Sequence, residues 1–170
     1  VYASSMGDGV IQYKNGTPVQ SYNEKNAFKE TAGGYGSGYC YIDGLAFDKN
    51  GNLWMTSSEV NHAVLVLDKA GAWHRLDIEQ LRGVYTINDI LITSTNDKWI
   101  YVPRNTPKLV MIPNSESLDE VSSYEFTTLI DTDGKELTPS NYTCVAEDKD
   151  GYIWVGTNRG AVYFLSLIHI

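Results

Sequence analysis

The sequence repeats itself, and this repeat constrains the fold more than any other feature. Residues 46–56 (AFDKNGNLWMT) match residues 146–157 (AEDKDGYIWVGT). A weaker copy, residues 91–101 (LITSTNDKWIY), lies between them. One tryptophan marks the same place in every copy, with steps of 45 and 55 residues along the chain: Trp54, Trp99 and Trp154. The chain is therefore expected to consist of similar structural units that follow one another.

The chemistry of each copy predicts a strand, a tight turn and a returning strand. Apolar residues precede the turn, as in a half-buried strand. At the turn, an aspartate accepts backbone hydrogen bonds and a glycine supplies a positive φ. These turn residues are Asp48 and Gly51 in the first copy and Asp148 and Gly151 in the last. In the middle copy Asn96 replaces the glycine, and Asn is a residue that tolerates a positive φ. The tryptophan then lies on the returning strand.

A unit of 45 to 55 residues fits a four-stranded blade of a β-propeller. We therefore predict an all-β fold, a partial β-propeller of four-stranded antiparallel blades, with about three to four blades in this chain. Whole blades are expected at 42–77 and 87–130, and partial blades at 1–24 and 142–165. Helix is nearly absent from the pattern, apart from a single turn near residues 78–81. The three repeat tryptophans are expected to be mostly buried at equivalent places.

Both ends of the sequence look like cuts through blades, so we expect a fragment of a larger ring. Strands at 10–13 and 19–22 would be the outer half of a blade. The strand at 161–165 would lack its outer partner. Because bare blade faces drive association, we predict that the fragment self-associates.

Charge and composition exclude several classes of partner and cofactor. The net charge is −8 and the 13 Lys and Arg residues are scattered, which disfavours nucleic acid. No stretch approaches the roughly 18 apolar residues of a membrane span. Cys40 and Cys144 belong to no metal-binding motif, and either two free thiols or one bridge fits them. The Asp-x-Asn/Asp-Gly segments lack the later Glu of a calcium loop. No metal and no cofactor are predicted.

Candidate ligand-binding residues follow from the alternation of strand direction within a blade. The starts of first strands and the loops after second strands share one rim, where loops vary on a rigid frame. Aligned on the tryptophans, the first-strand positions are Asp43, Asn88 and Thr143, and the loop positions are Glu59, Arg104 and Arg159. Polar residues at strand starts often form only hydrogen bonds within a turn. A structural role for these residues is therefore an open alternative to ligand binding.

Residues 148–160 (DKDGYIWVGTNRG) resemble the two-component regulator propeller repeat. This repeat builds periplasmic sensor domains of hybrid two-component systems in Bacteroidetes. A wider set of segments is similar to a narrower family, the surface propeller protein of the type IX secretion system: residues 43–48, 87–92, 98–99 and 103–104. Where the repeat has a glycine after the strand, as at Gly156, Thr56 and Val102 stand near the equivalent places.

These resemblances imply a non-enzymatic recognition or scaffold module at the periplasm or the cell surface. The type IX family implies a ligand that is a glycan, a lipopolysaccharide or a partner protein. The sensor family implies a ligand-sensing domain instead. A third alternative is a metal-dependent propeller lyase or lactonase, which needs carboxylates or histidines clustered in the channel. That alternative has little support, because the aligned channel positions supply a single carboxylate among Asp43, Asn88 and Thr143.

Overall fold

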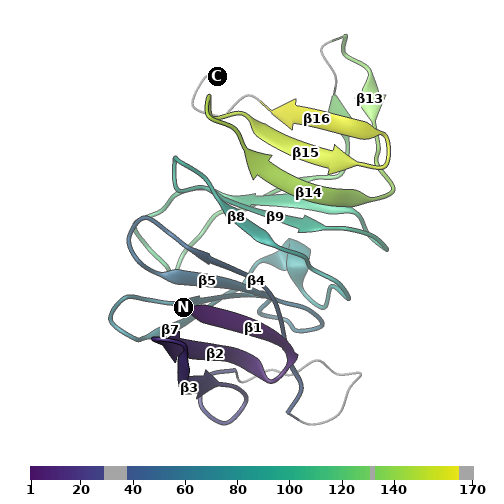
Figure 1. Cartoon of the computed structure of the whole chain (residues 1–170). Coiled ribbons are helices and arrows are strands. Elements are labelled where there is room, and N and C mark those ends of the chain that lie inside the picture. The colour runs from purple at the N-terminus through teal and green to yellow at the C-terminus, as the bar shows by residue number, and fades with distance from the viewer. Residues whose placement is uncertain (29–37, 131–132, 165–170) are drawn as a thin grey trace.

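The computed structural model describes residues 1–28, 38–130 and 133–164, and they form the predicted all-β fold (Figure 1). The strands, in chain order, are β1 (Tyr2–Gly7), β2 (Gly9–Lys14), β3 (Thr17–Tyr22), β4 (Cys40–Phe47), β5 (Leu53–Ser57), β6 (Val64–Leu67), β7 (Trp73–Leu76), β8 (Ile90–Ile92), β9 (Lys98–Val102), β10 (Lys108–Ile112), β11 (Tyr124–Phe126), β12 (Leu129–Ile130), β13 (Glu136–Leu137), β14 (Tyr142–Glu147), β15 (Ile153–Thr157) and β16 (Gly160–Phe164). One 3-10 turn, η1 (Glu79–Leu81), falls where a helical turn was expected. No helix in the described residues is long and apolar enough to cross a membrane.

The strands form antiparallel sheets that follow one another along the chain, from purple to yellow in Figure 1. Strands β4-β5-β6-β7 and β8-β9-β10-β11 each pair in sequence order, as four-stranded blades do. Strands β14-β15-β16 form a three-stranded sheet, and β12 pairs with β13. The exact boundaries of the blades stay a prediction, and residue 165, the expected end of the last one, lies outside the described residues.

The N-terminal sheet differs from the prediction of two outer strands. It contains β1, β2 and β3, and β1 also pairs with β4 through Met6–Tyr41 and Gly7–Cys40. Residues 2–7 (YASSMG) are mostly small and lack a regular alternation of large apolar residues, so the sequence shows no strand there. Strand β1 forms because β2 and β4 supply hydrogen-bonding partners on its two sides.

The turn of the repeat has the same backbone bonds in all three copies. The turn glycine or asparagine donates its N–H to the carbonyl three residues earlier, at 3.1, 2.9 and 3.1 Å. Its φ is +87° at Gly51, +70° at Asn96 and +83° at Gly151. Asn96 therefore takes the conformation that glycine takes in the other copies, which confirms the alignment.

The three tryptophans occupy the second strand of successive sheets, but they differ in how deeply they are buried. Trp54 is 1% exposed and packs with Ile90 and Ile100 of the next sheet. Trp99 is 4% exposed and shares a core with residues of β15, the middle strand of the last sheet. Trp154 is 41% exposed, so the prediction that it is mostly buried is wrong. The face that it occupies is covered by a following sheet in the other two cases, and no following sheet is present among the described residues.

The core lies between sheets, and one glycine sets how closely two sheets approach. A Cβ on Gly44 of β4 would lie 2.6 Å from the backbone nitrogen of Ile90 on β8. Gly44 also donates its N–H to Thr56 Oγ1 at 2.8 Å, and Thr56 Oγ1 donates to the carbonyl of Asn88 at 2.9 Å. The inner strands of the two sheets are therefore in backbone contact at this point.

The two cysteines are free thiols, which decides a question that the sequence left open. Cys40 is buried on β4, and Cys144 is exposed on β14, in a different sheet. Burial raises the pKa of the Cys40 thiol, with a further contribution from Glu24. The pair therefore contributes no covalent link between the sheets.

Candidate functional site

Asp43, one of the six predicted ligand-binding residues, has a strongly shifted pKa. It lies half-buried on β4 and accepts a 2.7 Å hydrogen bond from Ser58 Oγ. Ser58 Oγ in turn accepts a 2.8 Å bond from the N–H of Ile87, three residues before β8. Burial raises the pKa of Asp43 to about 6, against a smaller opposing effect of the Ser58 bond. The site therefore has a carboxyl group that titrates close to neutral pH.

Glu59 follows Ser58 and has an unusual backbone. Its φ is +62°, and its N–H donates to the carbonyl of Val84 at 2.8 Å. Glu59 Oε1 is buried and has no hydrogen-bond partner. A glutamate in the left-handed region with an unpaired buried oxygen is costly, and such costs concentrate at functional sites.

Two tyrosines complete this cluster, and sequence reasoning missed both. Burial raises the pKa of Tyr41, and the nearby charge of Asp43 raises it further, followed by Tyr39, Glu59 and Tyr85. Tyr41 and Asp43 are two residues apart on β4, and the charge of Asp43 acts on the Tyr41 hydroxyl. Tyr85 is 57% exposed. The closeness of Tyr41 to Asp43 in the sequence was the signal that could have identified Tyr41. Tyr85 instead follows Val84, whose carbonyl accepts the N–H of Glu59.

Asn88 and Thr143 lie along the same rim and join neighbouring sheets. Asn88 Nδ2 donates to the hydroxyl of Tyr101 at 3.1 Å, and that hydroxyl donates to the carbonyl of Thr143 at 3.2 Å. Thr143 therefore contributes its backbone to this bridge, while its own side chain is exposed. These contacts give Asn88 a structural role in addition to the predicted one.

The two predicted arginines lie on loops of later sheets, and not on the sheet that contains Asp43. Arg104 is exposed in the loop after β9, just before Asn105 with a φ of +70°. Arg159 is exposed in the turn between β15 and β16, where its N–H donates to Thr157 Oγ1 at 3.0 Å. The rim thus carries carboxylates and tyrosines toward the N-terminal sheets and arginines toward the C-terminal ones.

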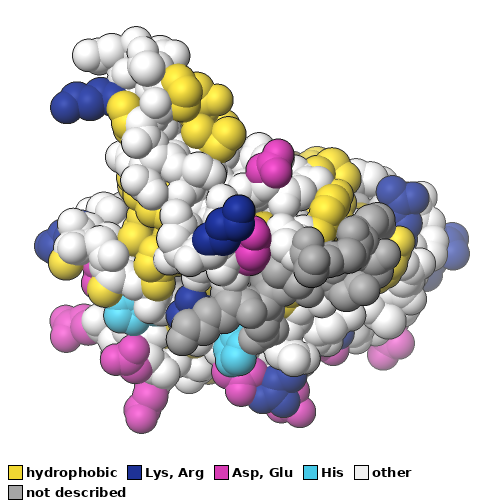
Figure 2. Space-filling view, turned by 90° about the horizontal axis from the view of Figure 1, so that it is seen from below, with side chains coloured by type: hydrophobic (Ala, Val, Ile, Leu, Met, Phe, Trp, Pro, Cys, Tyr) yellow, Lys and Arg dark blue, Asp and Glu magenta, His cyan; other side chains and the backbone are white. Residues whose placement is uncertain are grey.

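The chemistry of the rim suits recognition. Carboxylates accept hydrogen bonds from hydroxyl and amine groups, tyrosine rings pack on flat ligand surfaces, and exposed guanidinium groups bind anions. Within the described residues, no group of three His, Cys, Asp or Glu side chains is placed to hold a metal. Lys and Arg side chains are scattered over the face that Figure 2 shows.

Comparison with known proteins agrees with both resemblances inferred from the sequence. Residues 136–159 match the family described as two component regulator propeller. Among curated proteins, none matches the chain significantly. The structure of PorZ, a bacterial surface component of the type IX secretion system of Porphyromonas gingivalis, superposes with a TM-score of 0.88 at 17% identity. That match covers 98% of this chain and 23% of PorZ, so the chain spans under a quarter of that protein.

Two further structures are similar to smaller degrees. The structure of an inactive virginiamycin B lyase from Staphylococcus aureus with quinupristin has a TM-score of 0.50 at 16% identity. That match covers 74% of this chain and 41% of the lyase chain. The extracellular domain of a hybrid two component system from B. thetaiotaomicron has a TM-score of 0.48 at 17% identity, with 95% of this chain and 25% of that one covered. The last score is too low to carry an argument. At these identities, the likeness establishes the propeller fold alone.

Proposed function

We propose that this chain is part of a non-enzymatic propeller outside the cytoplasm, at the periplasm or the cell surface, that recognises a ligand or scaffolds a surface complex. The observation that carries the proposal is the superposition of 98% of the chain on PorZ, a surface component of the type IX secretion system. The ligand classes that fit the rim are a glycan, a lipopolysaccharide or a partner protein. No nucleic acid is proposed, because the net charge is −8.

The rim is the proposed contact surface, and its charge distribution orients the ligand. Asp43 and Glu59 would accept hydroxyl or amine donors, beside the rings of Tyr41 and Tyr85. Arg159, on a later sheet, would take an anionic group such as a phosphate or carboxylate. A ligand that spans the rim would therefore present donors toward one end and anionic groups toward the other.

An array of glycans and lipopolysaccharides, probed with the intact parent protein, tests this proposal. We expect binding that weakens at least tenfold in Glu59→Gln and Arg159→Ala. Glu116→Gln is the matched control, because Glu116 is exposed in the loop after β10. Equal binding by all three variants, or no binding to the array or to a purified protein of the same surface complex, would contradict the proposal.

A second candidate function is a ligand-sensing domain of a hybrid two-component system. The match of residues 136–159 to the regulator propeller family favours it. The two candidates differ in what accompanies the propeller in the full gene. A membrane span followed by a histidine kinase would select the sensor, and its absence from the full gene would select the surface protein.

The third alternative, a lyase or lactonase, is supported by the propeller likeness to virginiamycin B lyase. Fold likeness does not transfer activity, since many functions share one propeller frame. Metal-dependent turnover of a lactone or glycoside by the intact protein would replace our proposal with this one.

A further inference from the structure

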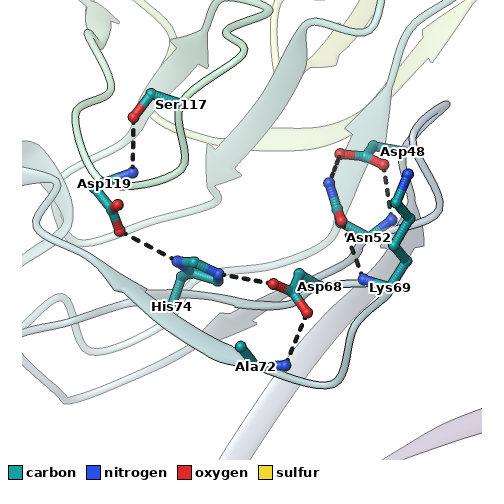
Figure 3. A network of polar contacts seen from close by, with 8 residues as sticks. All are labelled: Asp48, Asn52, Asp68, Lys69, Ala72, His74, Ser117 and Asp119. Atoms are coloured by element: carbon teal, nitrogen blue, oxygen red, sulfur yellow. Dashed lines mark hydrogen bonds and ion pairs between the residues drawn. The ribbon is translucent and has the colours of Figure 1, made fainter.

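One histidine links two neighbouring sheets through two carboxylates, as Figure 3 shows. His74 lies on β7, the outer strand of the sheet β4-β5-β6-β7. Its Nε2 is 3.2 Å from Asp68 Oδ2, in the turn between β6 and β7, and its Nδ1 is 3.3 Å from Asp119 Oδ1. Asp119 belongs to the loop of residues 113–123 that joins β10 to β11 in the next sheet, and we call this loop the strap. The His74 ring therefore bridges a turn of its own sheet and the strap of the next.

Both ring nitrogens meet carboxylate oxygens, and this arrangement depends on the charge of the ring. A neutral imidazole has one N–H, so it donates to one carboxylate while its other nitrogen turns a lone pair toward the second. A protonated imidazolium has two N–H groups and a positive charge, so it donates to both. Histidine is the side chain whose charge ordinarily changes between pH 5 and 8, whereas exposed carboxylates stay ionised over that range. The two contacts are therefore both favourable when His74 is protonated.

The two carboxylates depend on the ring to different degrees. Asp68 also accepts a 2.8 Å bond from the N–H of Ala72, and this bond, followed by the one from His74, lowers the pKa of Asp68. Asp119 has a side chain that is 86% exposed, and His74 is the partner of its carboxylate among the described residues. A neutral ring should therefore keep its single N–H on Asp68. Asp119 then faces a lone pair, and its carboxylate can return to water.

The other charged side chains around the ring do not neutralise these carboxylates. On β7, the β6-β7 turn and the strap, or directly after β7, they are Lys69, Arg75, Asp77, Glu116 and Glu120. Lys69 extends away from the ring in Figure 3, Arg75 donates to the carbonyl of Ala27, and Asp77 is paired with Arg82 at 2.5 Å. Strand β6, which pairs with β7 beside the ring, carries no charged residue. Within the described part of the chain, no Lys or Arg forms an ion pair with Asp68 or Asp119, so the protonated ring supplies their positive charge.

The strap is held by few other side chains. Leu118 and Val121 are partly buried against the core between the two sheets, and Ser123 Oγ donates to Gln80 Oε1 at 2.9 Å. A cleft of about 430 Å³ is lined by residues 119–122 of the strap and by the end of β7 at Leu76. Because the strap is not packed tightly on β7 at this cleft, one charge-dependent contact can shift its position.

We infer that His74 is a pH-sensitive latch, which holds the strap on the sheet β4-β5-β6-β7 when it is protonated and releases Asp119 when it is neutral. Proton binding and closing favour each other, so the closed form predominates at acidic pH and is lost as the pH rises through the titration of the ring. Opening widens the cleft beside the apolar side chain of Leu76. The latch involves none of the rim residues, so it does not depend on the proposed function.

Hydrogen–deuterium exchange of the intact protein, followed by mass spectrometry at pH 5 and pH 8, tests the latch. The readout is the exchange rate of peptides from the strap in His74→Gln, divided by the rate in the unmodified protein at the same pH. This ratio cancels the intrinsic pH dependence of exchange, because the substitution lies outside the strap. At pH 5 the variant should exchange about threefold faster, as expected for the loss of a weak ion pair. At pH 8 the two proteins should exchange alike, because the unmodified latch is already open.

A second variant, Asp119→Asn, guards against loss of the fold in His74→Gln, because the Asp119 side chain is exposed. After correction for its own intrinsic exchange, it should also loosen the strap at pH 5 and have little effect at pH 8. Glu120→Gln is the matched control, since it removes the same charge from the next residue, which is also exposed, and it should exchange like the unmodified protein.

Three outcomes would overturn the inference. The first is an equal effect of His74→Gln at pH 5 and pH 8, which would make His74 a structural contact without pH dependence. The second is a larger effect at pH 8 than at pH 5, which would reverse the sign. The third is an effect of Glu120→Gln as large as that of Asp119→Asn, which would mean that the strap responds to net charge and not to the latch.

Discussion

The carboxylate of Asp48 accepts a 2.9 Å hydrogen bond from the indole Nε1 of Trp54, six residues further along the chain. The same carboxylate accepts backbone bonds from Asn50 at 2.9 Å and Asn52 at 2.8 Å. Burial alone would raise the pKa of Asp48, but the bonds from Trp54, Asn52 and Asn50 outweigh it and lower the pKa. The residue that closes the turn therefore also orients the ring that fills the space to the next sheet.

Asp48→Ala should be strongly destabilising, because it leaves a buried indole N–H and two turn N–H groups without partners. We expect a loss of about 2–4 kcal/mol in the free energy of unfolding, measured by urea denaturation. Asp148→Ala is the matched control, since Asp148 makes the equivalent 2.7 Å bond to the exposed Trp154. It should cost clearly less, and equal losses would contradict this account.

Low pH should reduce the free energy of unfolding through the protonation of Asp48. The folded-state pKa of Asp48 is below its ordinary value, so the folded state binds fewer protons than the unfolded state near that pH. Its contribution to stability is present above the unfolded pKa and is lost as the pH falls through the folded pKa. Denaturation curves from pH 5 down to pH 2 should show a steeper loss for the unmodified protein than for Asp48→Asn. Parallel curves would contradict this.

Asp43 should have the opposite pH dependence. Its folded pKa of about 6 lies above the ordinary 3.8, so the folded state binds more protons between these values. The free energy of unfolding should therefore fall as the pH rises from about 4 to about 6. Asp43→Asn should remove this fall and be more stable above pH 7 by about 1–2 kcal/mol, a figure reduced for partial solvent screening. Glu116→Gln is the control, and an unchanged profile in Asp43→Asn would contradict the expectation.

Gly44→Ala should disrupt the contact between the second and third sheets. The added Cβ would meet the backbone of Ile90 at 2.6 Å and of Asp89 at 2.9 Å, and backbone cannot move aside as a side chain can. We expect a loss of about 3 kcal/mol or more. Gly71→Ala is the comparison, because its φ is +91° but nothing lies within 4 Å, and about 1 kcal/mol is expected. Thermal unfolding of the two variants checks the order, and the reverse order would refute it.

The last sheet should make the purified chain self-associate. Trp154 and Tyr163 are 41% and 51% exposed with ring centroids 5.1 Å apart, on a face that a following sheet covers elsewhere. We expect a dimer or larger assembly by light scattering at micromolar concentration. Tyr163→Ser should shift it toward monomer, whereas Tyr124→Ser, at a residue 53% exposed on β11, should not. A well-folded monomer of the unmodified chain would refute the prediction.

Features that depend only on neighbours within one repeat can be predicted from the residues of that repeat. The turn needs a positive φ at Gly51, Asn96 and Gly151, and glycine and asparagine are the residue types that adopt it most readily. The position of each tryptophan on a second strand follows from its fixed distance to that turn. Period and turn chemistry are local, so the repeat alone predicted the all-β fold and the antiparallel sheets.

Features that depend on how one sheet packs on the next are set by contacts between distant parts of the chain. Trp154 has a local sequence similar to that of Trp54 but differs in exposure, because a neighbouring sheet and not its own repeat would bury it. Strand β1 needed β2 and β4 as partners before its weak pattern could form a strand. The rings of Tyr2 and Phe47 meet with centroids 5.7 Å apart, although 45 positions separate them in the chain. No local period encodes such a distance, because the side chains that meet there are chosen by packing between sheets.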